Sequence, residues 1–196
     1  RGDRWAFHVD GRELVLRLPF DQRHMAENVL AALTAYDLLG LPLDRAEDGA
    51  SAIRLSRWRG EVRPLTGGGV VVNDAYNANP TSMRAALTDL VERAAGRRTV
   101  AILGEMAELG LEADAFHREI GGLLETLGIE VVIGVGAPAR LYLEQSTAET
   151  HAIPDVAAFE TVAHAIRPGD VILVKASRAV ALEGIPAQIE KLAEAW

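Results

Sequence analysis

Short apolar runs alternate with segments of helical periodicity through most of the chain. The runs are rich in β-branched residues and have the length of strands, at residues 70–73, 99–103, 130–135, 151–153 and 171–174. The helical segments are 80–94, 111–127, 137–145, 155–166 and 179–193. Near-continuously apolar strands must be buried on both faces. The alternation therefore predicts an α/β fold over residues 67–196, with a Rossmann-like, doubly wound and mostly parallel sheet.

Residues 1–66 follow another pattern. Two alternating stretches, 4–9 and 12–18, flank Asp10-Gly11, a dipeptide that supplies the positive φ angles of a tight turn, so we expect a β-hairpin. Apolar residues at helical spacing predict a helix over 24–39.

Two further elements are expected before the alternating region. Asp44, with Glu47 three residues later, predicts a capping box for a short helix that ends near residue 53. A second hairpin is expected from residues 61–65 and 70–73. Because residues 1–66 lack a complete core of their own, they are interpreted as the end of another domain.

The composition of the chain argues against some classes of binding partner and indicates a cellular compartment. The chain of 196 residues carries 20 Lys and Arg against 28 Asp and Glu, and its formal net charge of −8 argues against nucleic acid or a membrane as partner. The absence of cysteine fits the reducing cytoplasm. Apolar runs such as 131–135 are too short to span a bilayer, and no secretory leader is visible. Since the first residue is Arg1 rather than Met, we expect a fragment of a longer protein. We also expect the protein to be cytoplasmic and monomeric.

Polar side chains follow three of the expected strands, at the point where each strand ends. In an open parallel sheet, ligands bind beyond the carboxyl ends of the strands, where helices begin with free N–H groups. We therefore expect these side chains to meet at one edge of the sheet. They are Asp74, Tyr76, Asn77 and Asn79 after the first strand, Glu105 and Glu108 after the second, and Lys175, Ser177 and Arg178 after the fifth.

The cluster after the first strand has a plainer explanation as well. Asn79 followed by Pro80 is a common helix start, in which the Asn side chain caps the helix. Asp74 suits a ribose diol and Tyr76 suits packing on a base, but a solvated turn would use the same residues. Capping alone does not explain Asp74, Tyr76 and Asn77.

The other candidates are open to the same question. Glu105 and Glu108 also suit a charged approach to a helix, and a lone helical histidine such as His117 is commonly a residue of the surface or the core edge. Lys175 ends an apolar run at the expected ligand edge, where Ser177 and Arg178 extend a positive corner suited to a phosphate or a carboxylate. Residues 134–136, Gly-Val-Gly, lack the third glycine of a dinucleotide fingerprint, so no hydride-transfer cofactor is expected.

Taken together, three motifs resemble the Mur ligase family in the order in which they occur. They are NDAYNANPTSMRAAL, LGEMAELG followed by His117, and VKASRA. HMAENVLAA and RWRGEVRPL are similar to the closing segments of that family's central ATPase domain. The resemblance covers nearly the whole chain and points to the members that add D-alanyl-D-alanine to the peptidoglycan precursor. It implies that residues 1–66 end the central ATP-binding domain and that residues 67–196 form the C-terminal domain.

The resemblance also implies an activity. The family activates the carboxylate of UDP-MurNAc-tripeptide as an acyl phosphate, using ATP and Mg²⁺, and the dipeptide amine then attacks it. By the match, Asn28 and Tyr76 would line the adenine, Asp74 would hold the ribose, and Arg59 would lie near the ribose or phosphates. The dipeptide site would draw on Asn77, Asn79, Glu105, Glu108, Ser177 and Arg178, with Lys175 and His117 as the catalytic candidates.

Two departures from the family pattern limit these expectations. His24 is followed by Met25, where the family usually has His-Asn, although Asn28 is present. No G-x-x-x-x-G-K-[ST] loop occurs, nor do the central domain's metal ligands, so the chain alone is expected not to catalyse ligation. A related ligase of the folylpolyglutamate or tripeptide stage, and a nucleotide-binding module without chemistry, stay open as alternatives.

Overall fold

The computed structural model describes residues 4–196, and the chain divides into two compact units between Ser56 and Arg57. No helix within the described residues combines the length and the apolar character needed to cross a membrane.

The first unit is a β-hairpin with two helices. Strands β1 (Arg4–Val9) and β2 (Arg12–Arg17) pair antiparallel, and Asp10 and Gly11 turn between them with φ angles of 44° and 73°. The expected hairpin is therefore confirmed. Helices α1 (Arg23–Leu38) and α2 (Ala46–Ala52) complete the unit. They share with the hairpin a small apolar core of Phe7, Val9, Leu16, Leu18, Ala26, Leu33, Leu43 and Ala50.

The capping box predicted for the second helix is wrong. Helix α2 has Arg45 at its N-cap, and no side chain caps it. The Glu47 carboxylate instead accepts a hydrogen bond of 3.3 Å from the backbone N–H of Arg17, at the end of β2. A contact with the neighbouring strand has replaced the local one.

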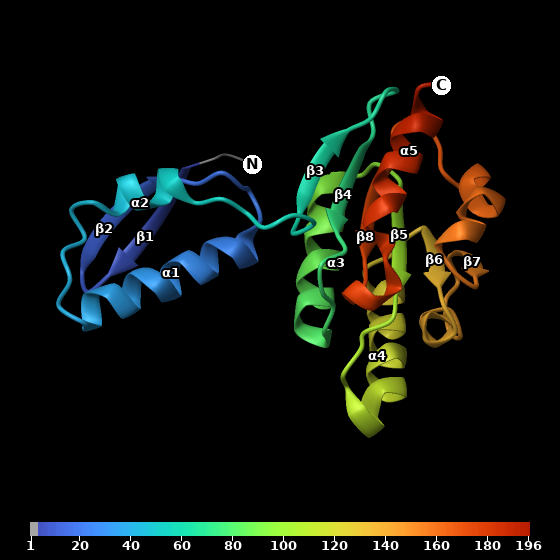
Figure 1. The fold of residues 1–196 in the computed structure, drawn as a ribbon, viewed down its shortest axis with the longest axis horizontal. Helices are drawn as coiled ribbons and strands as arrows, with labels where there is room; N and C mark the ends of the chain where they lie inside the picture. Colours follow the sequence, from blue (N-terminus) through green and yellow to red (C-terminus); the bar gives the residue numbers. More distant parts are fainter. Residues whose placement is uncertain (1–3) are drawn as a thin grey trace. The chain divides into compact units, whose positions relative to one another are not determined.

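The second unit contains a six-stranded sheet, as the alternation predicted. Its strands are β3 (Glu61–Pro64), β4 (Val70–Asp74), β5 (Thr99–Gly104), β6 (Val131–Val135), β7 (Glu149–Ile153) and β8 (Val171–Lys175). They lie in the order β3-β4-β8-β5-β6-β7, and only β3 runs antiparallel to its neighbour (Figure 1). Because β3 pairs with β4, it belongs to the second unit, and the spatial division of the chain falls before β3.

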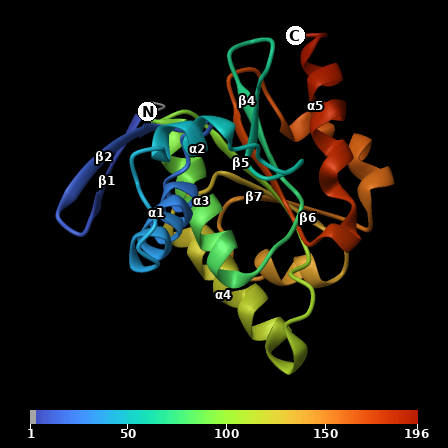
Figure 2. The same ribbon diagram turned by 60° about the vertical axis from the view of Figure 1, so that its left-hand side comes forward.

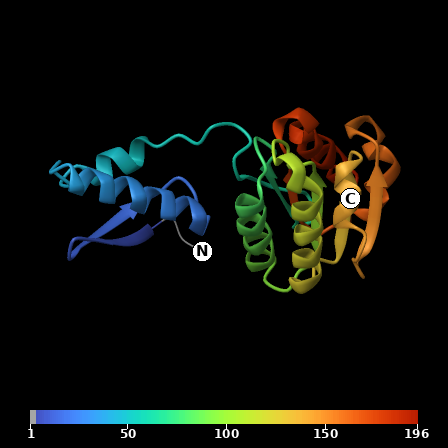
Figure 3. The ribbon, with the colours of Figure 1, turned by 90° about the horizontal axis from the view of Figure 1, so that it is seen from below.

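Helices cover both faces of this sheet. One face packs against α3 (Pro80–Ala94), α4 (Ala113–Thr126) and the 3₁₀ segment η2 (Pro138–Tyr142). The other packs against α5 (Ile185–Ala193) and the 3₁₀ segment η3 (Val156–Ala165). Figure 3 shows α3 and α4 together on one side and α5, in red, on the other. Short 3₁₀ turns, η1 (Gly110–Glu112), η4 (Arg178–Val180) and η5 (Leu182–Gly184), connect these elements.

Two of the expected α-helices are 3₁₀ segments, η2 and η3. In η3 the buried residues are Phe159, Val162 and Ala165, which recur every three residues. A 3₁₀ helix has three residues per turn, so this spacing keeps all three on one face. At η2, a Cβ on Gly134 would lie 3.0 Å from the backbone oxygen of Ala139, so this segment runs unusually close to β6.

The order of the strands creates a switch point at the carboxyl edge. After β4 and β5 the chain continues into α3 and α4 on one face of the sheet. After β8, which lies between those two strands, it continues into α5 on the opposite face. Figure 2 shows α3 and α4 side by side, with α5 apart from them. Loops that leave neighbouring strands in opposite directions leave a crevice between them, and this is where ligands bind in open α/β sheets.

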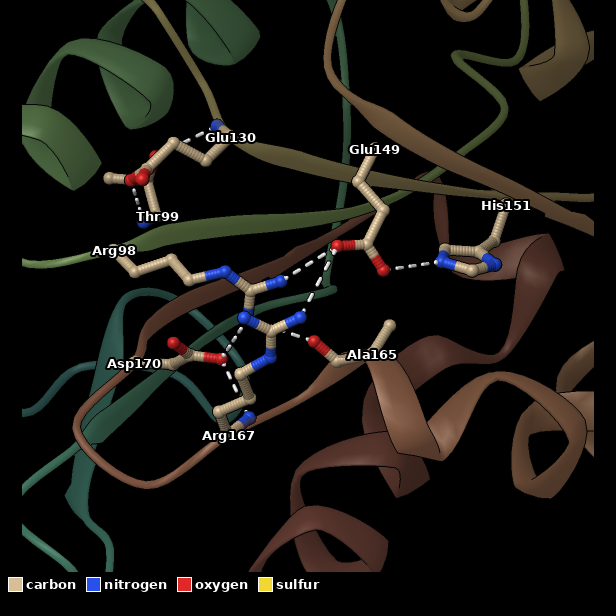
Figure 4. A network of polar contacts seen from close by, with 8 residues as sticks. All are labelled: Arg98, Thr99, Glu130, Glu149, His151, Ala165, Arg167 and Asp170. Atoms are coloured by element: carbon tan, nitrogen blue, oxygen red, sulfur yellow. Dashed lines mark hydrogen bonds and ion pairs between the residues drawn. The ribbon is translucent and has the colours of Figure 1, made fainter.

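The opposite edge of the sheet is closed by an ionic network (Figure 4). The Arg98 guanidinium donates hydrogen bonds to Asp170, Glu149 and the backbone oxygen of Ala165, at 2.9, 3.0 and 2.9 Å. His151 Nε2 lies 3.0 Å from Glu149 Oε1. Residues from β7, from the end of η3 and from the segments before β5 and β8 are thus joined at one point.

The pKa values of the two carboxylates in this network, Glu149 and Asp170, are shifted in opposite directions. The hydrogen bond from His151, followed by the charges of Arg98 and Arg167, lowers the pKa of Glu149 below its ordinary value of 4.5. Burial raises the pKa of Asp170, although Arg167 and Arg98 oppose the shift. A lowered carboxylate pKa contributes stability above the unfolded value, and this is lost as the pH falls through the folded value.

A pair of adjacent glycines in α4 tests the packing between α4 and η2. A Cβ on Gly121 would lie 2.9 Å from the backbone oxygen of Tyr142, whereas a Cβ on Gly122 would meet no atom within 4 Å. We expect Gly121→Ala to lower the free energy of unfolding by about 1–3 kcal/mol, because a backbone must move. Gly122→Ala should raise it by about 0.5–1 kcal/mol. Urea denaturation of both variants measures this, and equal effects would contradict the packing described.

The ionic network predicts a pH dependence. Glu149→Gln should lower the unfolding temperature near about pH 7, where wild-type Glu149 is ionised, and the difference from wild type should disappear near about pH 3. Thermal unfolding followed by circular dichroism across this range measures it. The exposed Glu160→Gln variant serves as control, with a curve parallel to wild type. A Glu149→Gln difference that persists at the acid end would show that the charge is not the cause.

Candidate functional site

The predicted polar clusters meet at the carboxyl ends of β4, β8 and β5. In the sheet register, Asp74 at the end of β4 is the partner of Lys175 at the end of β8, and Lys175 is also the partner of Leu103 on β5. The Ser177 backbone N–H donates to the Glu105 backbone oxygen at 2.9 Å. The expectation that Asp74, Glu105 and Lys175 gather at one edge is therefore confirmed.

Lys175 is the buried centre of this edge. Only 2% of its surface is exposed. Its ammonium lies 2.6 Å from Asp74 Oδ2 and donates to the Asn77 backbone oxygen at 2.8 Å. The ammonium therefore neutralises Asp74 and fastens the loop that follows β4. In this arrangement Lys175 acts on the protein itself, and Asp74 reaches the crevice with one oxygen already bound.

Ser177 ties three loops together. Its hydroxyl oxygen accepts a hydrogen bond of 2.8 Å from the Ala107 backbone N–H, in the loop after β5, and lies 3.4 Å from the Ala78 backbone oxygen, in the loop after β4. Only 4% of its surface is exposed. Ser177 therefore fixes the positions of the loops on either side of β8.

His117 supports the loop after β5 from within the protein. Its Nε2 accepts a hydrogen bond of 3.0 Å from the Met106 N–H, which requires the proton to lie on Nδ1, and Nδ1 donates to the Ala113 backbone oxygen at 2.7 Å. The ring is 1% exposed and lies 5.1 Å from the Tyr142 ring. Both ring nitrogens are engaged with backbone, so the geometry favours a structural His117 over a proton-transfer group.

Tyr142 supports the last residue of β5, directly before the same loop. Its hydroxyl donates to the Gly104 backbone oxygen at 2.9 Å. Burial, with a smaller effect from the Glu105 charge, raises the pKa of Tyr142 well above its ordinary value. Tyr142 therefore stays a neutral donor. Sequence reasoning missed this residue, because nothing in its local pattern marks a tyrosine that reaches another strand.

Asn79 caps the N-terminus of helix α3, which confirms the capping explanation given for it from the sequence. Its side-chain oxygen accepts a hydrogen bond of 2.8 Å from the Ser82 N–H, and the Ser82 hydroxyl accepts one of 3.1 Å from the Asn79 N–H. The Asn77 side-chain oxygen accepts from the Ala78 N–H at 2.9 Å. Both amide oxygens accept hydrogen bonds from nearby backbone N–H groups, and both residues are exposed.

The outer part of the site is built from aromatic rings and arginines. Arg59 lies over the Tyr76 ring, with the guanidinium carbon 4.0 Å from the ring centre, and Arg178 lies over the Trp58 ring at 4.3 Å. Tyr76 is 37% exposed, although Arg59 covers one face of its ring. Trp58 was missed by sequence reasoning, although the signal was available: an aromatic residue directly before the candidate Arg59.

The remaining candidates lie at the edge or in the other unit. Glu105 is half-buried, and Glu108 is exposed with a φ angle of 65° in the loop after β5. Asn28 lies on α1, in the first unit, where it lines a largely apolar cavity of about 870 Å³ together with Leu16, Val29 and Leu43. Within the described residues, no three His, Asp or Glu side chains gather closely enough to hold a metal ion.

Comparison with known proteins agrees with this geometry. The family model described as "Mur ligase, glutamate ligase domain" matches residues 58–178, which is more than half of the chain. The chain belongs to the Mur ligase family. This confirms the resemblance seen in the motifs, and the α/β fold with its mostly parallel sheet is that of the family's C-terminal domain.

Among the relatives are enzymes named UDP-N-acetylmuramoyl-tripeptide–D-alanyl-D-alanine ligase. That of Mycobacterium tuberculosis (strain CDC 1551) is 34% identical over 93% of this chain and 41% of its own length. That of Bacillus subtilis is 31% identical over 91% of this chain and 40% of its own. This Mur ligase chain therefore spans about two fifths of the length of these relatives.

Solved structures give the same result. The crystal structure of MurF from Acinetobacter baumannii superposes with a TM-score of 0.83 at 26% identity, over 96% of this chain and 42% of that one. MurF from Thermotoga maritima, in complex with ADP, superposes with a TM-score of 0.77 at 25% identity, over 98% and 44%.

The Asp74–Lys175 pair predicts a specific stability pattern. Asp74→Ala leaves the buried ammonium with a single backbone partner, so we expect the free energy of unfolding to fall by about 2–3 kcal/mol. Adding Lys175→Met should restore at least about 1 kcal/mol, because the uncompensated charge is then gone. A double-mutant cycle by urea denaturation measures both. Additive losses would show that the two side chains do not depend on each other.

Proposed function

We propose that this chain is the carboxyl-terminal portion of an ATP-dependent amide ligase that adds D-alanyl-D-alanine to UDP-MurNAc-tripeptide in peptidoglycan synthesis. The observation that carries the proposal is the 34% identity to D-alanyl-D-alanine ligases over 93% of this chain. The structure supports it by bringing the three motif clusters together at the switch point of the sheet, where open α/β sheets bind ligands.

The nucleotide contact of the second unit would be made by Tyr76 and its neighbours. The exposed Tyr76 ring offers a face on which adenine can stack, and Arg59, now above that face, would turn to the ribose or the phosphates. Asp74 would hold the ribose with the oxygen that Lys175 leaves available. Asn28, on the first unit, would contribute to the adenine site. ATP, with Mg²⁺, would supply the phosphoryl group that activates the tripeptide carboxylate.

The dipeptide contact would lie at the loops after β5 and β8. Glu105 and Glu108 provide negative charge suited to an ammonium group, and Arg178 provides a guanidinium suited to a carboxylate. The hydrogen bonds of Lys175, Ser177 and His117 hold these loops in place before a ligand arrives. Fixed positions lower the entropic cost of bringing the amine to the activated carboxylate. We thus assign these three residues to positioning.

The proposal predicts which substrates are needed together. The full-length enzyme that contains these 196 residues should release phosphate from ATP at a substantial rate only when both UDP-MurNAc-tripeptide and D-alanyl-D-alanine are present. A coupled phosphate assay, with each component omitted in turn, measures this. The 196-residue chain alone should show no turnover, because it contains no G-x-x-x-x-G-K-[ST] loop. Equal turnover with glutamate in place of the dipeptide would reject this assignment and favour the folylpolyglutamate type.

A further inference from the structure

Three polar side chains follow β8, but only one of them is available to a ligand. Lys175 is bound to Asp74 and Asn77, and Ser177 is bound to Ala107. Arg178 is exposed, and within residues 4–196 neither a carboxylate nor a backbone oxygen accepts a hydrogen bond from its guanidinium. Its described side-chain contact is the Trp58 ring.

Stacking on a ring orients an arginine without using its donors. The central carbon of the Arg178 guanidinium lies over the Trp58 ring, 4.3 Å from the ring centre. The five N–H groups of a guanidinium lie in its plane and point away from its edges. A guanidinium that contacts a ring, and no carboxylate or carbonyl oxygen, keeps its donors free for a carboxylate or phosphate, and its geometry allows two parallel hydrogen bonds to one such group.

Trp58 is itself held in place by several contacts. It has a φ angle of 62°, in the left-handed region that a bulky residue seldom adopts. Its backbone N–H donates to Glu61 Oε1 at 2.8 Å, and its carbonyl oxygen accepts from the Tyr76 N–H at 3.1 Å. Glu61 is fixed in turn by Arg63 at 3.1 Å. Unfavourable backbone conformations persist where surrounding contacts over-determine them, and they concentrate at ligand sites.

The same backbone joins two arginine–aromatic pairs. The hydrogen bond from Tyr76 to Trp58 links the ring that carries Arg59 to the ring that carries Arg178. For Arg59, too, no ion-pair partner is present among the described residues. The guanidiniums of Arg59 and Arg178 thus lie over two rings that one backbone hydrogen bond links, and the guanidinium of Arg57 lies farther from the Trp58 ring centre, at 5.4 Å.

We propose that Trp58 is a positioning residue that holds the Arg178 guanidinium ready for an oxyanion, a carboxylate or a phosphate, at the carboxyl edge of the sheet. The ligand is bound by Arg178 and not by Lys175 or Ser177. The choice of the dipeptide carboxylate as the physiological oxyanion rests on the function proposed above, whereas the oxyanion site itself does not.

Nuclear magnetic resonance of the 196-residue chain tests the proposal. The side-chain Hε resonance of Arg178 should be shifted upfield by the Trp58 ring, and Trp58→Leu should abolish this shift. Titration with inorganic phosphate, and separately with D-alanyl-D-alanine, should move the Arg178 Nε resonance. Trp58→Leu should weaken both affinities about fivefold, Trp58→Phe should recover most of the loss, and Arg178→Lys should weaken them to a similar extent.

Matched controls separate the possible outcomes. Arg118→Lys, at an arginine paired with Glu144 on the surface of α4, should leave both affinities unchanged. D-alanyl-D-alanine amide, which lacks the carboxylate, should not move the Arg178 resonance. If phosphate binds and the dipeptide does not, the oxyanion site stands and its link to the proposed function fails. If neither ligand moves the resonance, or if Trp58→Leu binds both as wild type does, the proposal is overturned.

Discussion

The carboxyl edge of the sheet depends on one buried cation. Lys175 carries its charge into a position that is 2% exposed, where an ammonium is costly unless it is paired and hydrogen-bonded. Asp74 and the Asn77 carbonyl meet that requirement, and both lie at or beyond the end of β4. Since β8 lies between β4 and β5, the satisfied lysine fastens the loop on one side while Ser177, two residues later, fastens the loop on the other. The shape of the crevice follows from these few bonds.

The fold was largely predictable because each element has a local signal. Apolar runs specify five of the six strands in the large sheet, Asp10-Gly11 specifies the first hairpin, and Asn79-Pro80 specifies the start of α3. The errors occurred where a distant contact overrides a local pattern. Glu47 has the spacing of a capping residue but bonds to β2, and residues 156–165 form a 3₁₀ segment because their buried positions repeat every three residues. The contact of Glu47 cannot be seen before the chain is folded, whereas the three-residue spacing of Phe159, Val162 and Ala165 is already present in the sequence.

The location of the candidate site could be predicted from the sequence, but the roles of its individual residues could not. The rule that ligands bind beyond the ends of parallel strands brought Asp74, Glu105 and Lys175 together correctly. It does not distinguish a side chain that faces the ligand from one that holds the loop. Residue type alone made Lys175 and His117 attractive as catalytic groups, but each has its polar atoms bound to the protein. Trp58 was missed because its residue type suggests no polar role. Its hydrogen bonds to the site are made by its backbone alone.

The cations of this edge show two ways to hold positive charge. An ammonium is a compact, strongly hydrated charge that must be surrounded by acceptors once it is buried, so Lys175 has little left to offer a ligand. A guanidinium is flat and weakly hydrated, so an aromatic face can orient it while its donors stay free. Arg59 and Arg178 both rest on rings in this way. The inner cation thus builds the site and the outer ones are left to bind, which accounts for the use of lysine inside and arginine outside at the same edge of one sheet.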